Sequence, residues 1–273
     1  MAPDMKRVDL PSMVGATNQL QIRFPDASET LSQDEEWAEV LLDGEWRRFR
    51  LHDYDELYKV PGLYESLYYR ALRCNSPVRV VSLLAETLED HYVPPETLRV
   101  LDFGAGNGMV GYELQSIGVS TVVGVDLIPE AKESTLRDRA WCYADYFVAD
   151  LTALPDETAK QIRDYQLNCL TCVAALGFGD IPADAFLTAI DLLEPTGWIA
   201  FNIKEDFMQD RDQSGFAKLI RALGREDVIQ MQAFRRYQHR ISIKGEALYY
   251  GAMIATKSKA VPASLKGVDW AAS

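Results

Sequence analysis

A glycine-rich turn between an apolar strand and a helix is the feature that most constrains this chain. Residues 99–103 form a short apolar run typical of a buried strand, and apolar residues recur at helical spacing from Met109 onward. Between them lie Gly104, Gly106 and Gly108, which allow positive φ angles and place no Cβ in the way of a ligand. The helix N-terminus that follows attracts polar ligand groups. The stretch therefore predicts a ligand site at the end of a strand.

The spacing of these glycines distinguishes between kinds of nucleotide site. A dinucleotide fingerprint, G-x-G-x-x-G, requires a third glycine at position 109, where this chain has Met109. Asp102 closes the strand, and a carboxylate there repels a pyrophosphate but attracts an ammonium group, directly or through water. Both observations disfavour an NAD-dependent oxidoreductase, which stays as an alternative. S-adenosylmethionine carries both an ammonium and a sulfonium.

Two further strand-like runs end in carboxylates. Residues 121–126 end in Asp126, which stands 22 positions after Gly104, and an acidic side chain at that place accepts hydrogen bonds from ribose hydroxyls. In the third run, residues 146–151, Asp150 is placed to accept from an adenine amino group.

Strand and helix patterns alternate through the rest of the chain. We expect strands at 99–103, 121–125, 145–148, 167–174 and 197–203, and helices at 108–116, 129–137, 155–163 and 183–194. A helix is predicted at 78–88 before them, and a helix at 215–223 and two long strands at 228–243 and 247–256 after them. Such alternation predicts an α/β fold with a mostly parallel sheet, helices on both faces and a ligand at the carboxyl ends of the strands.

In these motifs the chain resembles the class I S-adenosylmethionine-dependent methyltransferases, specifically their small-molecule-type domains. The resemblance covers roughly residues 96–257 and rests on LDFGAGNG, VVGVD, ADL and CVAALGFGDIP, which occur in the family's order. It implies a Rossmann-like sheet closed by an antiparallel last strand, with S-adenosylmethionine as cofactor and S-adenosylhomocysteine as product.

The resemblance also assigns roles to single residues. It implies that a tyrosine-bearing N-terminal helix covers the cofactor, with Tyr54 and Tyr58 as candidates. The methionine part would be held by Asp102, Gly104, Ala105 and Gly106, the ribose by Asp126, the adenine by Leu127, Asp150 and the backbone of Leu151, and Ala174 would lie beside the cofactor.

The acceptor is narrowed by composition and by one missing motif. With 28 Lys and Arg against 41 Asp and Glu, the formal charge is −13, which disfavours a nucleic acid as partner. After residues 167–174 the chain continues Ala175-Leu176-Gly177 and lacks the Asn/Asp-Pro-Pro-aromatic sequence of methyltransferases that act on planar amide or amino nitrogens. We therefore expect a small organic acceptor.

The chain divides into three parts on sequence alone. Residues 1–95 combine an arm, a β-hairpin around Asp43-Gly44 and a helical cap; residues 96–257 form the core; residues 258–273 form a loose tail. Asp-Gly between two apolar runs is a strong hairpin signal because it adopts the positive φ angles of a type I′ turn.

Location, metal and catalytic base are less constrained. The chain has only four cysteines and no apolar run of membrane length, which favours a cytoplasmic protein without membrane contact. The sequence leaves open whether the protein is a monomer or a homodimer. Cys169 and Cys172 form C-x-x-C inside a predicted strand, where their side chains point to opposite faces, so no metal is expected.

Methyl transfer needs no nucleophilic side chain, and no motif identifies a base; the candidates are His52, His91, His239, Tyr54, Asp180 and Glu205. A second alternative is a methyltransferase-like binding module without catalysis.

Overall fold

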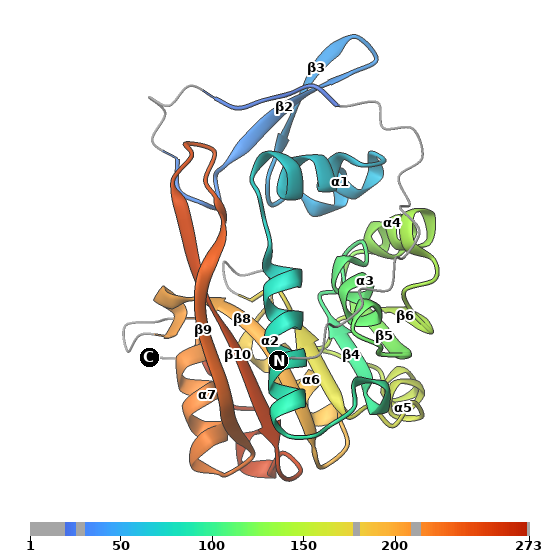
Figure 1. Ribbon diagram of the computed structural model, residues 1–273, viewed down its shortest axis with the longest axis vertical. Helices are drawn as coiled ribbons and strands as arrows, with labels where there is room; N and C mark the ends of the chain where they lie inside the picture. Colours follow the sequence, from blue (N-terminus) through green and yellow to red (C-terminus); the bar gives the residue numbers. More distant parts are fainter. Residues whose placement is uncertain (1–19, 26–30, 177–180, 209–213, 272–273) are drawn as a thin grey trace, which may run out of the picture.

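Two sheets and the helices around them make up the molecule. The computed structural model describes residues 20–25, 31–176, 181–208 and 214–271 (Figure 1). Among these, a seven-stranded sheet forms the body, and a three-stranded sheet lies above it at the N-terminal end. No helix in these ranges is long and apolar enough to cross a membrane.

The larger sheet has the strand order β6-β5-β4-β7-β8-β10-β9. Its strands are β4 (Arg99–Phe103), β5 (Thr121–Asp126), β6 (Asp145–Val148), β7 (Cys169–Cys172), β8 (Gly197–Lys204), β9 (Ile229–Ile241) and β10 (Ala247–Lys257). The first five run parallel, and β10 runs antiparallel to both of its neighbours. The strand order reverses between β4 and β7, which is where an open parallel sheet leaves a crevice. The predicted fold class is confirmed.

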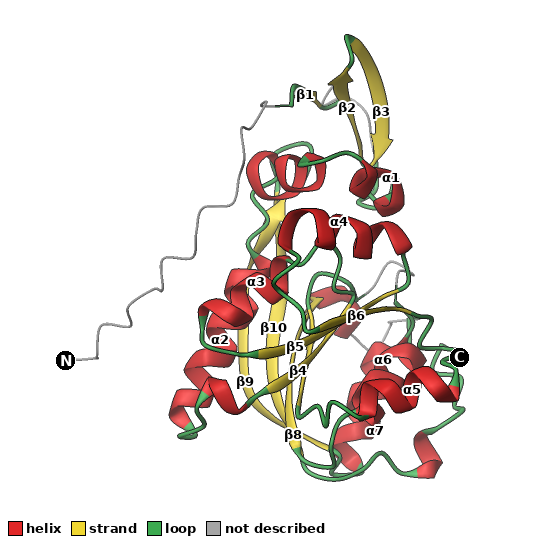
Figure 2. Ribbon diagram, turned by 90° about the vertical axis from the view of Figure 1, so that its right-hand side faces the viewer, coloured by secondary structure: helices red, strands yellow, loops and turns green. Residues whose placement is uncertain are grey.

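Helices cover both faces of this sheet. They are α2 (Ser76–Asp90), α3 (Met109–Ser116), α4 (Pro129–Arg139), α5 (Asp156–Arg163), α6 (Ala183–Leu192) and α7 (Phe216–Arg225). Figure 2 shows α2 and α3 on one side and α5, α6 and α7 on the other. Successive strand residues point to opposite faces of the sheet: Val100 packs with α2 and α3, whereas Leu101 packs with α5, α6 and α7. This alternation follows from the two-residue period of a strand.

The cap consists of the small sheet and two short helical segments. It contains β1 (Ile22–Arg23), β2 (Trp37–Leu42), β3 (Glu45–Arg50), α1 (Tyr54–Lys59) and the π-helical segment η1 (Glu65–Ala71). The hairpin of β2 and β3 is confirmed, with φ of 52° at Asp43 and 85° at Gly44. Strand β1, which pairs with β2, is not evident from the sequence because it is only two residues long.

The C-terminal segment differs from the expected loose tail. Val261, Leu265 and Trp270 are all buried and join the hydrophobic cluster of α5, α6 and α7. Trp270 lies so close to Gly215 that a Cβ there would come within 2.6 Å of the tryptophan backbone. Three apolar side chains spaced over ten residues have no helical or strand period, so the sequence pattern gave no sign of this packing.

The C-x-x-C cysteines behave as strand residues. Cys169 packs in the cluster of α2 and α3, and Cys172 packs in the cluster on the opposite face. Both thiols are buried and free, and burial raises the pKa of each. The strand interpretation is confirmed, and these cysteines serve the core.

Candidate functional site

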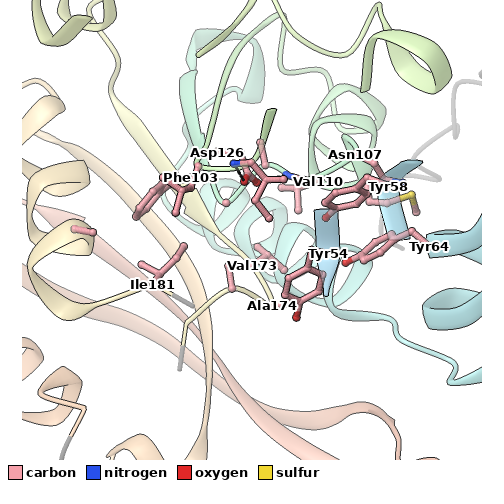
Figure 3. A pocket seen from close by; sticks show the side chains of 18 of the residues that line it. Tyr54, Tyr58, Tyr64, Phe103, Asn107, Val110, Asp126, Val173, Ala174 and Ile181 are labelled. Carbon is pink, nitrogen blue, oxygen red and sulfur yellow. Dashed lines mark hydrogen bonds between the residues drawn. The ribbon is translucent and has the colours of Figure 1, made fainter. Parts of the chain in front are cut away.

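A cavity of about 290 Å3 lies at the carboxyl ends of β4, β5 and β7, beneath the cap (Figure 3). Nine of the ten residues expected to bind the cofactor line it. They are Tyr58, Gly104, Ala105, Gly106, Asp126, Leu127, Asp150, Leu151 and Ala174. The fold thus brings together side chains from four strand ends and from the cap.

The glycine turn forms the floor of the cavity. Gly104 and Gly106 have φ angles of 71° and 53°, a region that other residues enter only with strain. A Cβ on Gly104 would meet the Cβ of Ala175 at 2.7 Å, and one on Gly106 would meet the hydroxyl of Tyr58 at 2.6 Å. The missing side chains therefore let the cap and the β7 loop come close to the backbone of the turn.

Asp126 holds its carboxylate at the edge of the cavity. One oxygen accepts the N–H of Gly106 at 2.8 Å and the other accepts the N–H of Ile128 at 3.0 Å. Burial raises the pKa of this carboxyl, while the backbone hydrogen bonds oppose that rise. Each carboxylate oxygen can accept a further hydrogen bond, so the group can bind ligand hydroxyls in the orientation that the backbone imposes.

Asp102 lies elsewhere than expected. Its side chain is fully buried and does not line the cavity. One oxygen accepts the hydroxyl of Tyr143 and the other accepts that of Thr171, each at 2.7 Å. Burial raises its pKa to about 6. The Asp102 carboxylate therefore lies beneath the turn, with its two oxygens bound by side chains of the protein.

The end of the cavity that Leu127 and Asp150 border is open to solvent. Leu127 keeps 60% of its surface exposed, and its side chain borders the cavity as a free apolar face. Asp150 uses one oxygen to accept the N–H and hydroxyl of Thr152, which lowers its pKa. Leu151 is buried in the core. The backbone at this point faces the cavity next to a carboxylate, an arrangement that can pair with the edge of a base.

Tyrosines of the cap form the roof. Tyr58 stacks on Tyr54, with centroids 6.4 Å apart, and lies 5.0 Å from Tyr64. Figure 3 shows the three rings together over the cavity. Tyr64 and Tyr69 also line the cavity, although only Tyr54 and Tyr58 were candidates from the sequence. Tyr64 is the N-cap of η1 and Tyr69 lies within it, and the density of tyrosines after Pro61-Gly62 was the signal that could have found them.

The candidate bases are spread widely. His52 and Tyr54 line the cavity, and His239 lines a smaller cavity beside it. His91 instead donates from Nδ1 to the Thr87 carbonyl near the opposite end of α2, and Glu205 pairs with Arg236 on the surface. Asp180 lies outside the described residues. No three His, Cys, Asp or Glu side chains gather into a metal site in the part of the chain that the structure describes.

A polar seam that the sequence did not reveal joins the turn to the cap. The Asn107 amide donates to Glu65 at 2.8 Å, and the Arg139 guanidinium donates to the same oxygen at 2.9 Å. Arg139 also donates to the backbone oxygen of Asn107. These residues are 42 and 74 positions from Glu65 in sequence, so no local pattern could pair them.

Comparisons with known proteins give one curated relative and several similar solved structures. The ribosomal protein L11 methyltransferase of Janthinobacterium sp. (strain Marseille) is 38% identical over 80 residues, which are 29% of this chain and only 23% of that protein. Among solved structures, the magnesium protoporphyrin IX methyltransferase of Synechocystis with bound SAM is similar, at 17% identity and a TM-score of 0.45, over 67% of this chain and 79% of that one. The ribosomal protein L11 methylase of Lactobacillus delbrueckii subsp. bulgaricus is similar at 19% identity and a TM-score of 0.43, over 66% and 78%.

The family match covers more of the chain than the curated relative does. A model of the methyltransferase domain matches residues 69–246, which include the glycine turn, Asp126 and all five parallel strands. Because this match spans well over half of the sequence, the chain belongs to the methyltransferase domain family.

Proposed function

We propose that this protein transfers a methyl group from S-adenosylmethionine to a small organic acceptor. The observation that carries the proposal is the cavity under the cap, where the glycine turn, the Asp126 carboxylate and a roof of tyrosines enclose about 290 Å3. A cavity of this volume with a roof of tyrosine rings suits a small acceptor. A formal charge of −13 works against a polyanionic one.

The cofactor would lie along the carboxyl ends of the strands. Asp126 would accept the two ribose hydroxyls, Leu127 would pack on the adenine, and Asp150 with the Leu151 backbone would pair with the adenine edge. The turn from Gly104 to Gly106 would hold the methionine part, beside Ala174. Asp102 would act from beneath the turn, through the hydroxyl of Tyr143 that it already accepts.

Methyl transfer requires no nucleophilic side chain. Bound S-adenosylmethionine supplies a methyl carbon made electrophilic by its sulfonium. The protein must hold the acceptor in line with that carbon and keep water out. Tyr54, Tyr58 and Tyr64 provide the closed apolar roof for this purpose, and burial keeps the hydroxyls of Tyr58 and Tyr64 protonated by raising their pKa values.

Titration calorimetry with S-adenosylmethionine, S-adenosylhomocysteine and NAD tests the cofactor assignment. We expect micromolar binding of both adenosyl ligands, no response to NAD, and loss of binding in Asp126→Ala. The control is Asp164→Ala, which removes an exposed carboxylate. Binding of NAD alone would favour the oxidoreductase. Cofactor binding with no turnover across a broad acceptor screen would favour a non-catalytic binding module.

A further inference from the structure

A buried asparagine interrupts the apolar side chains of strand β8. Asn202 is fully buried and is not among the described residues that line the cofactor cavity. It lies on the same face of the sheet as Ala200, which packs in the cluster of α2 and α3. A buried amide is costly unless its polar atoms are hydrogen-bonded. The partners of Asn202 therefore indicate why a central strand holds it.

The amide oxygen of Asn202 holds a strained turn beside the cavity. It accepts the N–H of Ala174 at 2.6 Å. Ala174 has a φ of 58°, a left-handed conformation that alanine adopts only at a cost. The next residue, Ala175, packs against Gly104, where an added Cβ would meet the Ala175 Cβ at 2.7 Å. Both alanines line the cavity, so the bond from Asn202 keeps this turn against the glycine turn.

A chain of buried hydrogen bonds fixes the direction in which the Asn202 amide faces. Because the oxygen faces Ala174, the nitrogen faces the Tyr237 hydroxyl at 2.6 Å and donates to it. The Tyr237 hydroxyl lies 2.7 Å from Ser76 Oγ, and Ser76 Oγ lies 2.6 Å from His239 Nδ1. The Tyr237 proton therefore goes to Ser76, and the Ser76 proton goes to His239 Nδ1. This direction leaves the proton of the His239 ring on Nε2.

The opposite direction would leave donors facing each other. With a proton on Nδ1 of His239, Ser76 would donate to Tyr237, and the Tyr237 proton would point at the Asn202 amide. Either orientation of that amide would then place two donors face to face, at Tyr237 or at Ala174. Burial lowers the pKa of His239 to about 3, so the ring is neutral near pH 7 and Nδ1 can accept.

We propose that Asn202 is a positioning residue of the cofactor site, which holds the Ala174 turn against Gly104 while the chain ending at His239 keeps the amide oxygen toward that turn. The inference rests on the proposed methyltransferase function. Asn202 acts through Ala174, which would lie beside the methionine part of the cofactor. Without the hydrogen bond, the strained turn is free to move away from the glycine turn, and cofactor binding weakens.

Titration calorimetry with S-adenosylhomocysteine tests this role in two variants and a control. Asn202→Leu removes the acceptor at similar volume and should weaken binding about tenfold. Asn202→Asp keeps an oxygen for the Ala174 N–H, so its Kd should stay within about threefold of the wild-type value. Thr87→Val is the control, because it removes a buried hydrogen bond in α2, from Thr87 to the Leu83 carbonyl. It should leave the Kd unchanged.

Two measurements by NMR need no cofactor. The Ala174 amide should exchange with solvent deuterium at least tenfold faster in Asn202→Leu than in the wild type or in Asn202→Asp. The nitrogen spectrum of the wild-type histidine rings should show His239 with Nε2 protonated and Nδ1 bare. His239→Gln identifies its signals among the three histidines of the chain. If Asn202→Leu fails to fold, Asn202→Asp and the wild-type ring signals decide.

The outcomes separate this inference from the proposed function. Wild-type affinity in Asn202→Leu, a tenfold loss in Asn202→Asp, or an equal loss in Thr87→Val overturns the positioning role and leaves the methyltransferase standing. A proton on Nδ1 of His239 overturns the assigned direction of the chain. If the wild type binds no adenosyl ligand, the proposed function is overturned, and exchange of the Ala174 amide decides whether Asn202 holds the turn.

Discussion

The two sides of the site are built in opposite ways. The cofactor side comes from one stretch, with Gly104, Gly106 and Asp126 inside 23 consecutive residues. The wall where the cap meets β9 and β10 joins Gln33 and His239, which are more than 200 positions apart. The first side presents a carboxylate and backbone groups, whereas the second presents rings and a charge pair that cancels itself. A local motif can therefore indicate a cofactor, whereas the contact between the cap and the long strands cannot be read from the sequence.

The largest expected effect comes from breaking the charge pair between Glu36 of the cap and Arg240 of β9. Glu36→Ala leaves the Arg240 guanidinium buried without its partner, and we expect it to lower the free energy of unfolding by about 3–5 kcal/mol. Glu36 also accepts the N–H of Ile243, so the cap would loosen from β9. Urea denaturation measures the loss.

The double variant Glu36→Leu/Arg240→Met is the control for that experiment. It removes both charges and keeps the volume apolar, so it should be clearly more stable than Glu36→Ala. A double variant as unstable as the single one would show that packing, and not the unpaired charge, holds the cap.

The same contrast explains what the sequence could predict. The parallel strands and their helices were predictable because period-2 and period-3.6 patterns are local, and β4 and β6 fall at their expected residues. Strand β7 ends at Cys172 and not at 174, because Ala174 has a φ of 58° and cannot continue a strand. The apolar run gave no sign of that turn.

The site shows the same limit in its side chains. The spacing of Gly106 and Asp126 placed both at the cavity, since the ends of adjacent parallel strands meet at one edge of a sheet. Asp102 was expected to attract the ligand's ammonium directly or through water, and its carboxylate oxygens are occupied by the hydroxyls of Tyr143 and Thr171. Which face a strand-terminal carboxylate takes depends on partners 41 and 69 residues away, which no local pattern encodes.

On the cofactor side, Asp102 makes stability depend on pH. Its pKa of about 6 lies above the ordinary value of 3.8, so between these pH values the folded protein binds more protons than the unfolded chain. The contribution of Asp102 to stability is therefore greatest below pH 3.8 and is lost as pH rises through 6. As pH rises from 4 to 7, the free energy of unfolding of Asp102→Asn should increase by about 3 kcal/mol relative to that of the wild type.

Denaturation at several pH values measures this gain. The exposed variant Asp164→Asn is the control and should track the wild type throughout. A constant difference between Asp102→Asn and wild type would mean that Asp102 keeps an ordinary pKa and that its two hydroxyl donors fully offset its burial.

A smaller effect is expected where the two sides touch, at Gly106. Gly106→Ala places a Cβ at a φ of 53° and within 2.6 Å of the Tyr58 hydroxyl, for a loss of about 1–3 kcal/mol. Adding Tyr58→Phe removes the contacting oxygen and should restore part of the thermal stability. At Gly62, with a φ of 74° and nothing within 4 Å, an alanine should be equally costly with and without Tyr58→Phe. Recovery at both glycines would mean that Tyr58→Phe stabilises the cap generally.

The smallest expected effect tests whether the two sides move as one body. Glu65 is the shared acceptor of Asn107 and Arg139, so Glu65→Ala should cost about 1 kcal/mol because these groups are partly solvated. The loss falls on the contact between cap and turn, and amides of α1 should exchange about fivefold faster with solvent deuterium. Glu56→Ala, which removes only an exposed pair with Lys59, should leave that exchange unchanged. If Glu65→Ala also leaves it unchanged, the bonds from Glu65 to Asn107 and Arg139 do not hold the tyrosine roof in place, and the cap can open without disturbing the glycine turn.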